Sequence, residues 1–210
     1  MNKIDLIKEV PSAWIGHIGF AGWLVNHCQP KVTVDLGVDY GTSTFSFAVP
    51  NIGMVYGIDC FEGDAHTGIR QTLPLVKSKA KELDLGNILL IKGYFNDVAE
   101  SWTQNIDILH IDGFHEYLAV KNDFNTWSRF LNNDGVILLH DTRVEHFGVK
   151  DFFQEIDWPK INFQHSAGLG IVSKNKTLLN TICDTFTGTQ SQELYYNNLR
   201  TVTVECVKYF

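Results

Sequence analysis

Five short, strongly apolar segments, separated by polar or helical stretches, constrain the fold of this chain more than any other feature of its sequence. Each segment is nearly continuous in Val, Ile and Leu rather than strictly alternating. This pattern is typical of strands in a parallel sheet that helices cover on both faces. The segments are "VTVDL" (32–36), "MVYGID" (54–59), "NILLIKG" (87–93), "IDILHID" (106–112) and "GVILLHD" (135–141).

Helical and hairpin patterns complete the expected sheet. Residues 11–28 and 115–135 carry apolar side chains at helical spacing, and the second of these predicts a right-handed crossover between the fourth and fifth strands. Further on, "FGVKDFFQEIDWP" predicts a helix closed by Pro159, and "INFQHS" with "LGIVSKN" predicts a hairpin. We therefore expect an α/β, Rossmann-like, doubly wound and mostly parallel sheet of seven strands with an antiparallel edge hairpin.

The length of 210 residues fits one domain with a substantial core better than two full domains. We expect residues 1–174 to form this domain, N-terminal helix included. Residues 175–210 are expected to extend it, as a helix to about Arg200 and then a β-like segment. The aromatic last residue, without a polar tail, is compatible with one part of a longer multidomain chain, and a homodimer is left open.

Charge and cysteine content narrow the possible partners. A net charge of -7 without a cluster of Lys or Arg argues against nucleic acid and against an anionic membrane surface. The sequence has no run of 18 apolar residues and no signal peptide, so we expect a soluble cytoplasmic protein. Cys28, Cys60, Cys183 and Cys206 lie far apart with no CxxC pair, which predicts that all four are reduced.

Carboxylates gather at the ends of the expected strands, where open parallel sheets bind their ligands. Asp59, Asp112 and Asp141 end three of the five segments, and Asp35 lies one residue before the end of a fourth. The first strand continues as "VDLGVDYGTST", whose glycines allow a tight turn and a close approach of the backbone to a ligand. An acid at the end of the second strand is placed to accept hydrogen bonds from a ribose diol. These features suit both NAD and S-adenosylmethionine.

The glycine spacing favours S-adenosylmethionine over NAD. A dinucleotide fingerprint needs G-x-G-x-x-G, whereas Asp39 stands here in the place of the middle glycine. A carboxylate at that position would repel a pyrophosphate but tolerate an ammonium group. A cofactor with an amino-acid end and a cationic sulfonium therefore fits better.

Several motifs carry a family resemblance. "VDLGVDYGTST" resembles the E-L-G-x-x-x-G-x-S motif of class I S-adenosylmethionine-dependent methyltransferases of the catechol O-methyltransferase type. In the same order, "YGIDCFEGDAHTG", "ILHIDGFHEYLAVKNDF", "GVILLHDT" and "GLGIVSKN" look like a bacterial subfamily often found beside glycosyltransferases. The resemblance covers about residues 11–174.

The resemblance implies roles for individual residues. The turn after the first strand would hold the methionine moiety, Asp59 would bind the ribose, and Phe95 and Phe114 would lie at the adenine. The expected cofactor-binding residues are Asp35, Gly37, Asp39, Gly41, Ser43, Asp59, Cys60, Phe95, Asp112 and Phe114.

The motif "DGFH" aligns with the D-x-x-K pattern of the relatives, which places His115 where they carry a catalytic lysine. Histidine, with a reference pKa near 6.5, suits removal of a proton from an acceptor hydroxyl at neutral pH. His140 is left open as an alternative base or as a ligand, and His110 is expected in the core. Asp112 and Asp141 could hold Mg²⁺. The relatives follow the second Asp with Asn, or precede it with Asp, where this chain reads His140-Asp141-Thr142.

Together these features favour an S-adenosylmethionine-dependent methyltransferase that acts on the hydroxyl of a small molecule or a sugar. The sugar is implied only because the subfamily that the chain resembles is often found beside glycosyltransferases. Two alternatives stay open: a catalytically silent methyltransferase-like binding domain and an NAD-type oxidoreductase.

Overall fold

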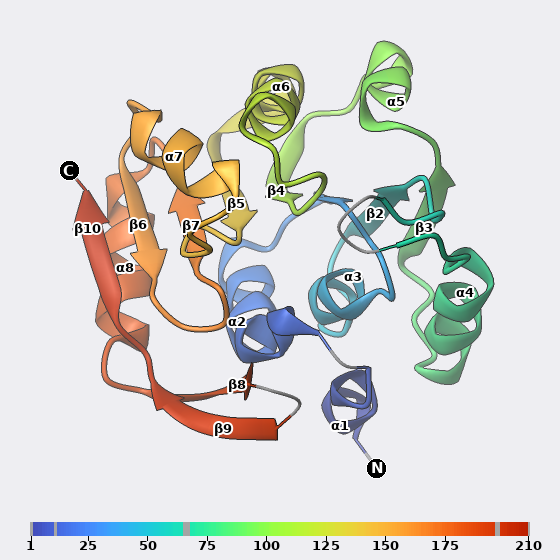
Figure 1. The fold of residues 1–210 in the computed structure, drawn as a ribbon, viewed down its shortest axis with the longest axis horizontal. Coiled ribbons are helices and arrows are strands. Elements are labelled where there is room, and N and C mark those ends of the chain that lie inside the picture. Colours follow the sequence, from blue (N-terminus) through green and yellow to red (C-terminus); the bar gives the residue numbers. More distant parts are fainter. Residues whose placement is uncertain (1, 11, 65–67, 196–197, 210) are drawn as a thin grey trace.

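The structure, a computed structural model, describes residues 2–10, 12–64, 68–195 and 198–209. Its main sheet has eight strands in the order β10-β6-β7-β5-β4-β1-β2-β3. The first five strands along the chain are parallel, and the other three are antiparallel to their neighbours (Figure 1). The strands are β1 (Val32–Leu36), β2 (Met54–Asp59), β3 (Ile88–Lys92), β4 (Ile106–Ile111), β5 (Leu131–His140), β6 (Lys160–Phe163), β7 (Leu169–Val172) and β10 (Cys206–Tyr209).

Helices cover both faces of this sheet (Figure 1). One face carries α2 (Ile18–Cys28), α3 (Thr42–Ala48) and α8 (Lys176–Phe186), and the other carries α5 (Phe95–Ser101), α6 (Tyr117–Trp127) and α7 (Gly148–Glu155). Around α3, a further apolar cluster adds α1 (Lys3–Lys8), the 3-10 helix η1 (Ala13–His17) and α4 (Leu73–Glu82). A short 3-10 turn, η2 (Ser128–Phe130), leads into β5. Among the described residues, no helix has the length and apolar character needed to cross a bilayer.

Strand β1 shows why the apolar runs are so dense. All five of its residues are buried. Val32, Val34 and Leu36 pack in the cluster that contains α5, α6 and α7, so the residues between them point to the opposite face, toward α2 and α3. Both faces are therefore inside the protein, and the strand tolerates a polar side chain only where a partner awaits it.

The parallel α/β core and the antiparallel edge hairpin are confirmed, but two details of the expected fold are wrong. The sheet has eight strands rather than seven, because β10 adds to β6. The helix expected to run to Arg200 ends at Phe186, and the chain then passes through Gly188 at φ +82°. A separate hairpin of β8 (Gln190–Tyr195) and β9 (Asn198–Thr203) follows, and Ser191 donates a hydrogen bond to the carbonyl of Gly16. Packing against η1 therefore overrides the helical pattern.

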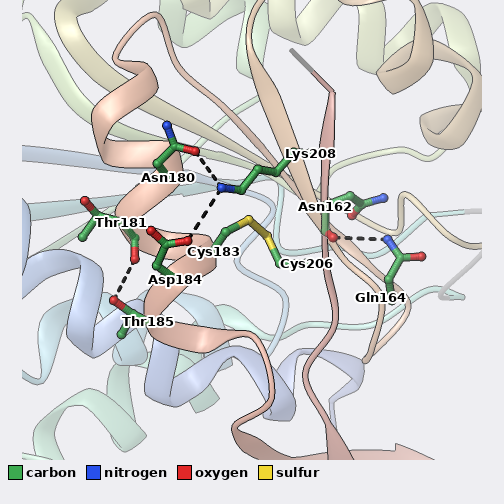
Figure 2. The surroundings of a disulfide bond; sticks show 9 residues. All are labelled: Asn162, Gln164, Asn180, Thr181, Cys183, Asp184, Thr185, Cys206 and Lys208. Carbon is green, nitrogen blue, oxygen red and sulfur yellow. Dashed lines mark hydrogen bonds and ion pairs between the residues drawn. A yellow bond between two sulfur atoms is a disulfide. The ribbon is translucent and has the colours of Figure 1, made fainter.

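A disulfide bond corrects the expectation that every cysteine is reduced. Cys183 on α8 and Cys206 on β10 are bonded, with their Cα atoms 5.6 Å apart (Figure 2). The two residues are 23 positions apart in sequence, and they meet because β10 returns to pair with β6 beside α8. Near the bond, Lys208 donates a 2.7 Å hydrogen bond to Asn180, which joins the same helix and strand. Cys28 and Cys60 are free thiols.

Candidate functional site

A cavity of about 840 Å³ lies beside the carboxyl ends of the parallel strands. Its walls come from the segments that follow β1, β2, β3, β4 and β5. Ten of the residues predicted from sequence line it: Gly37, Asp39, Asp59, Cys60, Phe95, Asp112, Phe114, His115, His140 and Asp141. Asp35, Gly41 and Ser43 do not line it and lie behind its wall.

Asp35 belongs to a sealed polar cluster beneath the cavity. Its Oδ1 lies 2.6 Å from Nδ1 of His110, and its Oδ2 accepts hydrogen bonds from the hydroxyls of Ser43 (2.8 Å) and Thr44. Nε1 of Trp14 donates a 3.0 Å hydrogen bond to Nε2 of His110, which leaves the histidine proton on Nδ1, facing Asp35. The Asp35 and His110 side chains are fully buried, so this cluster fixes β1, β4 and α3 rather than touching a ligand.

The turn after β1 requires glycine at its first position. Gly37 has φ +96°, and a Cβ atom there would lie 2.0 Å from the carbonyl oxygen of Asp112. The turn therefore passes directly against the segment after β4. Gly41, at φ +94°, is the residue before α3. This packing brings the ends of β1 and β4 into one wall of the cavity.

Asp59 links the turn after β1 to the turn after β2 through two hydrogen bonds. Its Oδ1 accepts the backbone N–H of Phe61 at 2.6 Å, and its Oδ2 accepts the N–H of Asp39 at 2.9 Å. Asp39 itself has φ +48° and lies 3.3 Å from the guanidinium of Arg70. Asp59 is thus held with its carboxylate at the cavity edge, where it retains lone pairs for a ligand.

Two aspartates and two histidines lie together after β4 and at the end of β5, and each histidine is close to both aspartates. Nε2 of His115 lies 2.9 Å from Asp141 and 3.7 Å from Asp112. Nδ1 of His140 lies 3.3 Å from Asp141 and 3.4 Å from Asp112. Asp141 reaches this position from a backbone at φ +62°, which is rare for a residue other than glycine. We call these four residues the open cluster, because all of them line the cavity.

Mutual attraction shifts the pKa values within the open cluster. Burial opposes the charge of His115, but hydrogen bonds with Asp112 and Asp141 outweigh it and raise the pKa of His115 to about 9. Burial also opposes the charge of His140, whose pKa the same two carboxylates raise well above the usual range. Although burial disfavours charged carboxylates, the two histidines hold the pKa values of Asp112 and Asp141 below normal. At neutral pH the four groups therefore carry balanced opposite charges.

The sequence interpretation missed Asp123 and Arg70, which also line the cavity. Asp123 lies on α6 with a side chain 7% exposed, and burial raises its pKa to about 6 against a hydrogen bond from Asn122. An acid on the apolar face of a helix, between Val120 and Trp127, was a readable signal. Arg70 lies between β2 and α4, outside any helix or strand, so no periodic sequence pattern predicted its position at the cavity.

The cavity lining carries a net negative charge, even with His115 and His140 protonated. Six aspartates line it: Asp39, Asp59, Asp64, Asp112, Asp123 and Asp141. Within the described part of the chain, Arg70 is the only Lys or Arg in the lining. A ligand with cationic groups is therefore favoured over one with several phosphates.

A mostly parallel sheet of this order, with an acid-lined cavity at the carboxyl ends of its strands, defines a Rossmann-like α/β ligand-binding protein. A family model described as a methyltransferase domain matches residues 34–142, just over half of the chain. The chain therefore belongs to this methyltransferase domain family.

A curated relative is similar in sequence to most of this chain. The y4gI protein of Sinorhizobium fredii is 33% identical over 178 residues, which cover 80% of this chain and 20% of y4gI. This chain therefore spans only about a fifth of the length of that relative.

Solved structures show the same fold at low sequence identity. A Staphylococcus aureus protein named for caffeoyl-CoA O-methyltransferase is 17% identical, with a TM-score of 0.63 over 79% of this chain and 86% of that one. An O-methyltransferase from Bacillus cereus, in complex with SAH, is 13% identical, with a TM-score of 0.58 over 75% and 80%. TomG from Streptomyces achromogenes, an O-methyltransferase in complex with SAM, is 13% identical, with a TM-score of 0.57 over 75% and 79%.

Proposed function

We propose that this chain is an S-adenosylmethionine-dependent methyltransferase that methylates a hydroxyl oxygen of a small molecule or a sugar. The observation that carries the proposal is the acidic cavity, into which a glycine turn, the ribose-type acid Asp59 and the open cluster all face. The family membership of residues 34–142 supports the reaction type. The sugar acceptor rests on the sequence resemblance alone.

The cavity lining fits the proposed cofactor chemically. The carboxylates suit a sulfonium and an ammonium group, and Asp59 keeps lone pairs available for ribose hydroxyls. Phe95 and Phe114, which also line the cavity, offer apolar surface for an adenine ring. TomG and the Bacillus cereus enzyme, which share the fold, were solved with SAM and SAH.

We assign the proton-accepting role to His115. Its ring stacks on Phe147 at 4.2 Å and it lines the cavity, whereas Nε2 of His140 is engaged by the carbonyl of Ser166 at 3.0 Å. With a pKa of about 9, His115 is protonated at neutral pH when only the protein groups surround it. Positive charge on the cofactor, and on a divalent cation at Asp112 and Asp141, would lower this pKa toward the range of a general base.

The donor set of the open cluster fits a divalent cation. Asp112, His115 and Asp141 place potential ligand atoms within 4.8 Å of one another. A bound cation supplies positive charge that orients an acceptor hydroxyl and eases its loss of a proton. Asp112 and Asp141 would hold this cation, and His115 would receive the proton.

We also infer that residues 175–210 are part of the same domain, because β10 pairs with β6 and the disulfide joins it to α8. Since the chain spans about a fifth of y4gI, we further propose that it works as one domain of a longer protein.

Calorimetric titration of the purified protein with S-adenosylmethionine, S-adenosylhomocysteine and NAD tests the proposed cofactor. We expect micromolar binding of the first two ligands and none of NAD. Screening of hydroxylated acceptors, sugars included, would follow with a methyl-transfer assay. Absence of binding by both methionine-derived ligands, in a protein shown to be folded, would contradict the proposal and favour a silent binding domain.

A further inference from the structure

Within the open cluster, His140 has a buried imidazole nitrogen that lies close to two carboxylates. His140 is 4% exposed. Its Nδ1 lies 3.4 Å from Oδ2 of Asp112 and 3.3 Å from Oδ1 of Asp141. Both distances exceed the roughly 2.7–2.9 Å of a charge-assisted hydrogen bond. Nδ1 therefore lies between the two oxygens without a short bond to either.

A network on the other side of the ring fixes its orientation. Nε2 of His140 donates to the carbonyl oxygen of Ser166 at 3.0 Å, and Nε2 of His17 lies 3.2 Å from the same oxygen. The backbone N–H of Ser166 donates in turn to Glu193 on β8 at 2.8 Å. Because Nε2 keeps its proton for this carbonyl, a metal ion would displace the proton of Nδ1 and take the lone pair that faces the two carboxylates. This is the arrangement of a histidine that binds a metal, its second nitrogen anchored to a backbone carbonyl.

The residue that could supply another oxygen donor is engaged elsewhere. Thr142 follows Asp141, at the position where the resembling methyltransferases carry Asn. Its hydroxyl donates a 2.8 Å hydrogen bond to Asn162 and is buried. An imidazole nitrogen therefore stands beside Asp112 and Asp141 where an amide oxygen would complete an all-oxygen set. The separations of Nδ1 from the two carboxylate oxygens, 3.4 and 3.3 Å, are close to those between neighbouring donors around one ion with bonds of about 2.1 Å.

We propose that Nδ1 of His140 is a metal ligand together with Asp112 and Asp141, and that this site selects a first-row transition metal over Mg²⁺. The inference rests on the proposed function only in placing a metal at this end of the cavity. Mg²⁺ strongly prefers oxygen donors and keeps several waters, whereas imidazole nitrogen suits Fe²⁺, Co²⁺ and Zn²⁺. His115 keeps the role of the base in this arrangement.

The metal preference is measured on EDTA-treated protein without S-adenosylmethionine. Calorimetric titration with cobalt(II) chloride and with magnesium chloride should show Co²⁺ binding at least about tenfold tighter than Mg²⁺. Equal affinities, tighter binding of Mg²⁺, or no binding of either ion would overturn the proposal.

Pulsed electron paramagnetic resonance of the Mn²⁺-loaded protein identifies the nitrogen ligand. The wild-type protein should show ¹⁴N modulation of the Mn²⁺ spin echo. His140→Asn should abolish it, and the matched control His27→Asn, on the exposed side of α2, should retain it. Absence of modulation in the wild-type protein, or its persistence in His140→Asn, would overturn the assignment.

A second variant covers the case in which His140→Asn does not fold. His115→Asn should keep the ¹⁴N modulation if His140 is the ligand, and loss of modulation would refute the assignment. Titration of the EDTA-treated protein with S-adenosylmethionine separates the two proposals. Cofactor binding without a nitrogen-ligated metal would refute only the metal site, and nitrogen-ligated metal without cofactor binding would refute only the proposed function.

Discussion

The protein contains two clusters of histidine and aspartate, one buried in the core and one lining the cavity. In the sealed cluster, Asp35 and His110 are fully buried, 2.6 Å apart, and every contact is made within the protein. In the open cluster, the separations between histidine and carboxylate run from 2.9 to 3.7 Å, and all four residues line the cavity. Residue type alone therefore does not identify a functional site. Access of the side chains to a ligand in the cavity is the feature that separates the two clusters.

Disrupting the sealed cluster should have the largest effect, and that effect should be on stability. Asp35→Ala leaves buried His110 and two hydroxyls without their acceptor. We expect a loss of about 3–5 kcal/mol in the free energy of unfolding, because each buried donor left without an acceptor costs about 1–3 kcal/mol. Urea denaturation of the variant and the wild-type protein measures it. A loss below about 1 kcal/mol would show that the cluster is not a structural support.

Asp123 tests whether burial destabilises the charged form of an acid that lines the cavity. Its pKa of about 6 exceeds the unfolded value near 3.9, so folding favours its protonated form. Well below about pH 3.9 the group is protonated in both states. Between about pH 4 and pH 6 the unfolded state ionises first, which costs the folded state up to about 3 kcal/mol at higher pH. Asp123→Asn should therefore raise the melting temperature at pH 8 but not at pH 4. An equal shift at both values would contradict this origin.

Substitution of His115 should distinguish a role in the chemical step from a role in cofactor binding. We expect His115→Ala to lower turnover by roughly 100-fold or more, with affinity for S-adenosylmethionine nearly unchanged. Steady-state kinetics with the acceptor found by screening, together with calorimetry, measure both quantities. Unchanged turnover would transfer the role to His140 or to the bound metal.

Asp59 shares one property with each cluster, and its substitution should have the smallest effect of the four. Like Asp35 it accepts two hydrogen bonds from the protein, yet it lines the cavity. Asp59→Ala should weaken binding of S-adenosylmethionine at least about tenfold, the lower value for one hydrogen bond to a charged group. Asp97→Ala, on the exposed side of α5, is the matched control for calorimetry. Equal affinities in the two variants would remove Asp59 from the binding site.

The sequence predicted the parallel core well because buried strands have a strong compositional signature. The positions of Asp59, Asp112 and Asp141 at the ends of β2, β4 and β5 followed from it. Asp35 was placed with the ligand because it also comes late in its segment. It lies one residue before the end of β1, however, so its side chain points toward α2 and α3.

What the sequence could not predict depends on contacts between distant segments. The hairpin of β8 and β9 is polar and mostly exposed, so its strands carry no apolar pattern. Contacts with η1, with α1 and with the loop between β6 and β7 hold it in place. The role of Ser166 as an anchor for His140 arises from the loop between β6 and β7, which no motif marks. The pairing of Cys183 with Cys206 likewise needed the position of β10.

The disulfide makes the C-terminal part of the chain tolerant of proteolysis. It encloses the β8 and β9 hairpin between α8 and β10, so a protease cut between residues 184 and 205 leaves both pieces covalently joined. The released end of β10 would stay tethered beside β6, and a nicked molecule would run as a single species until a reductant separated its fragments.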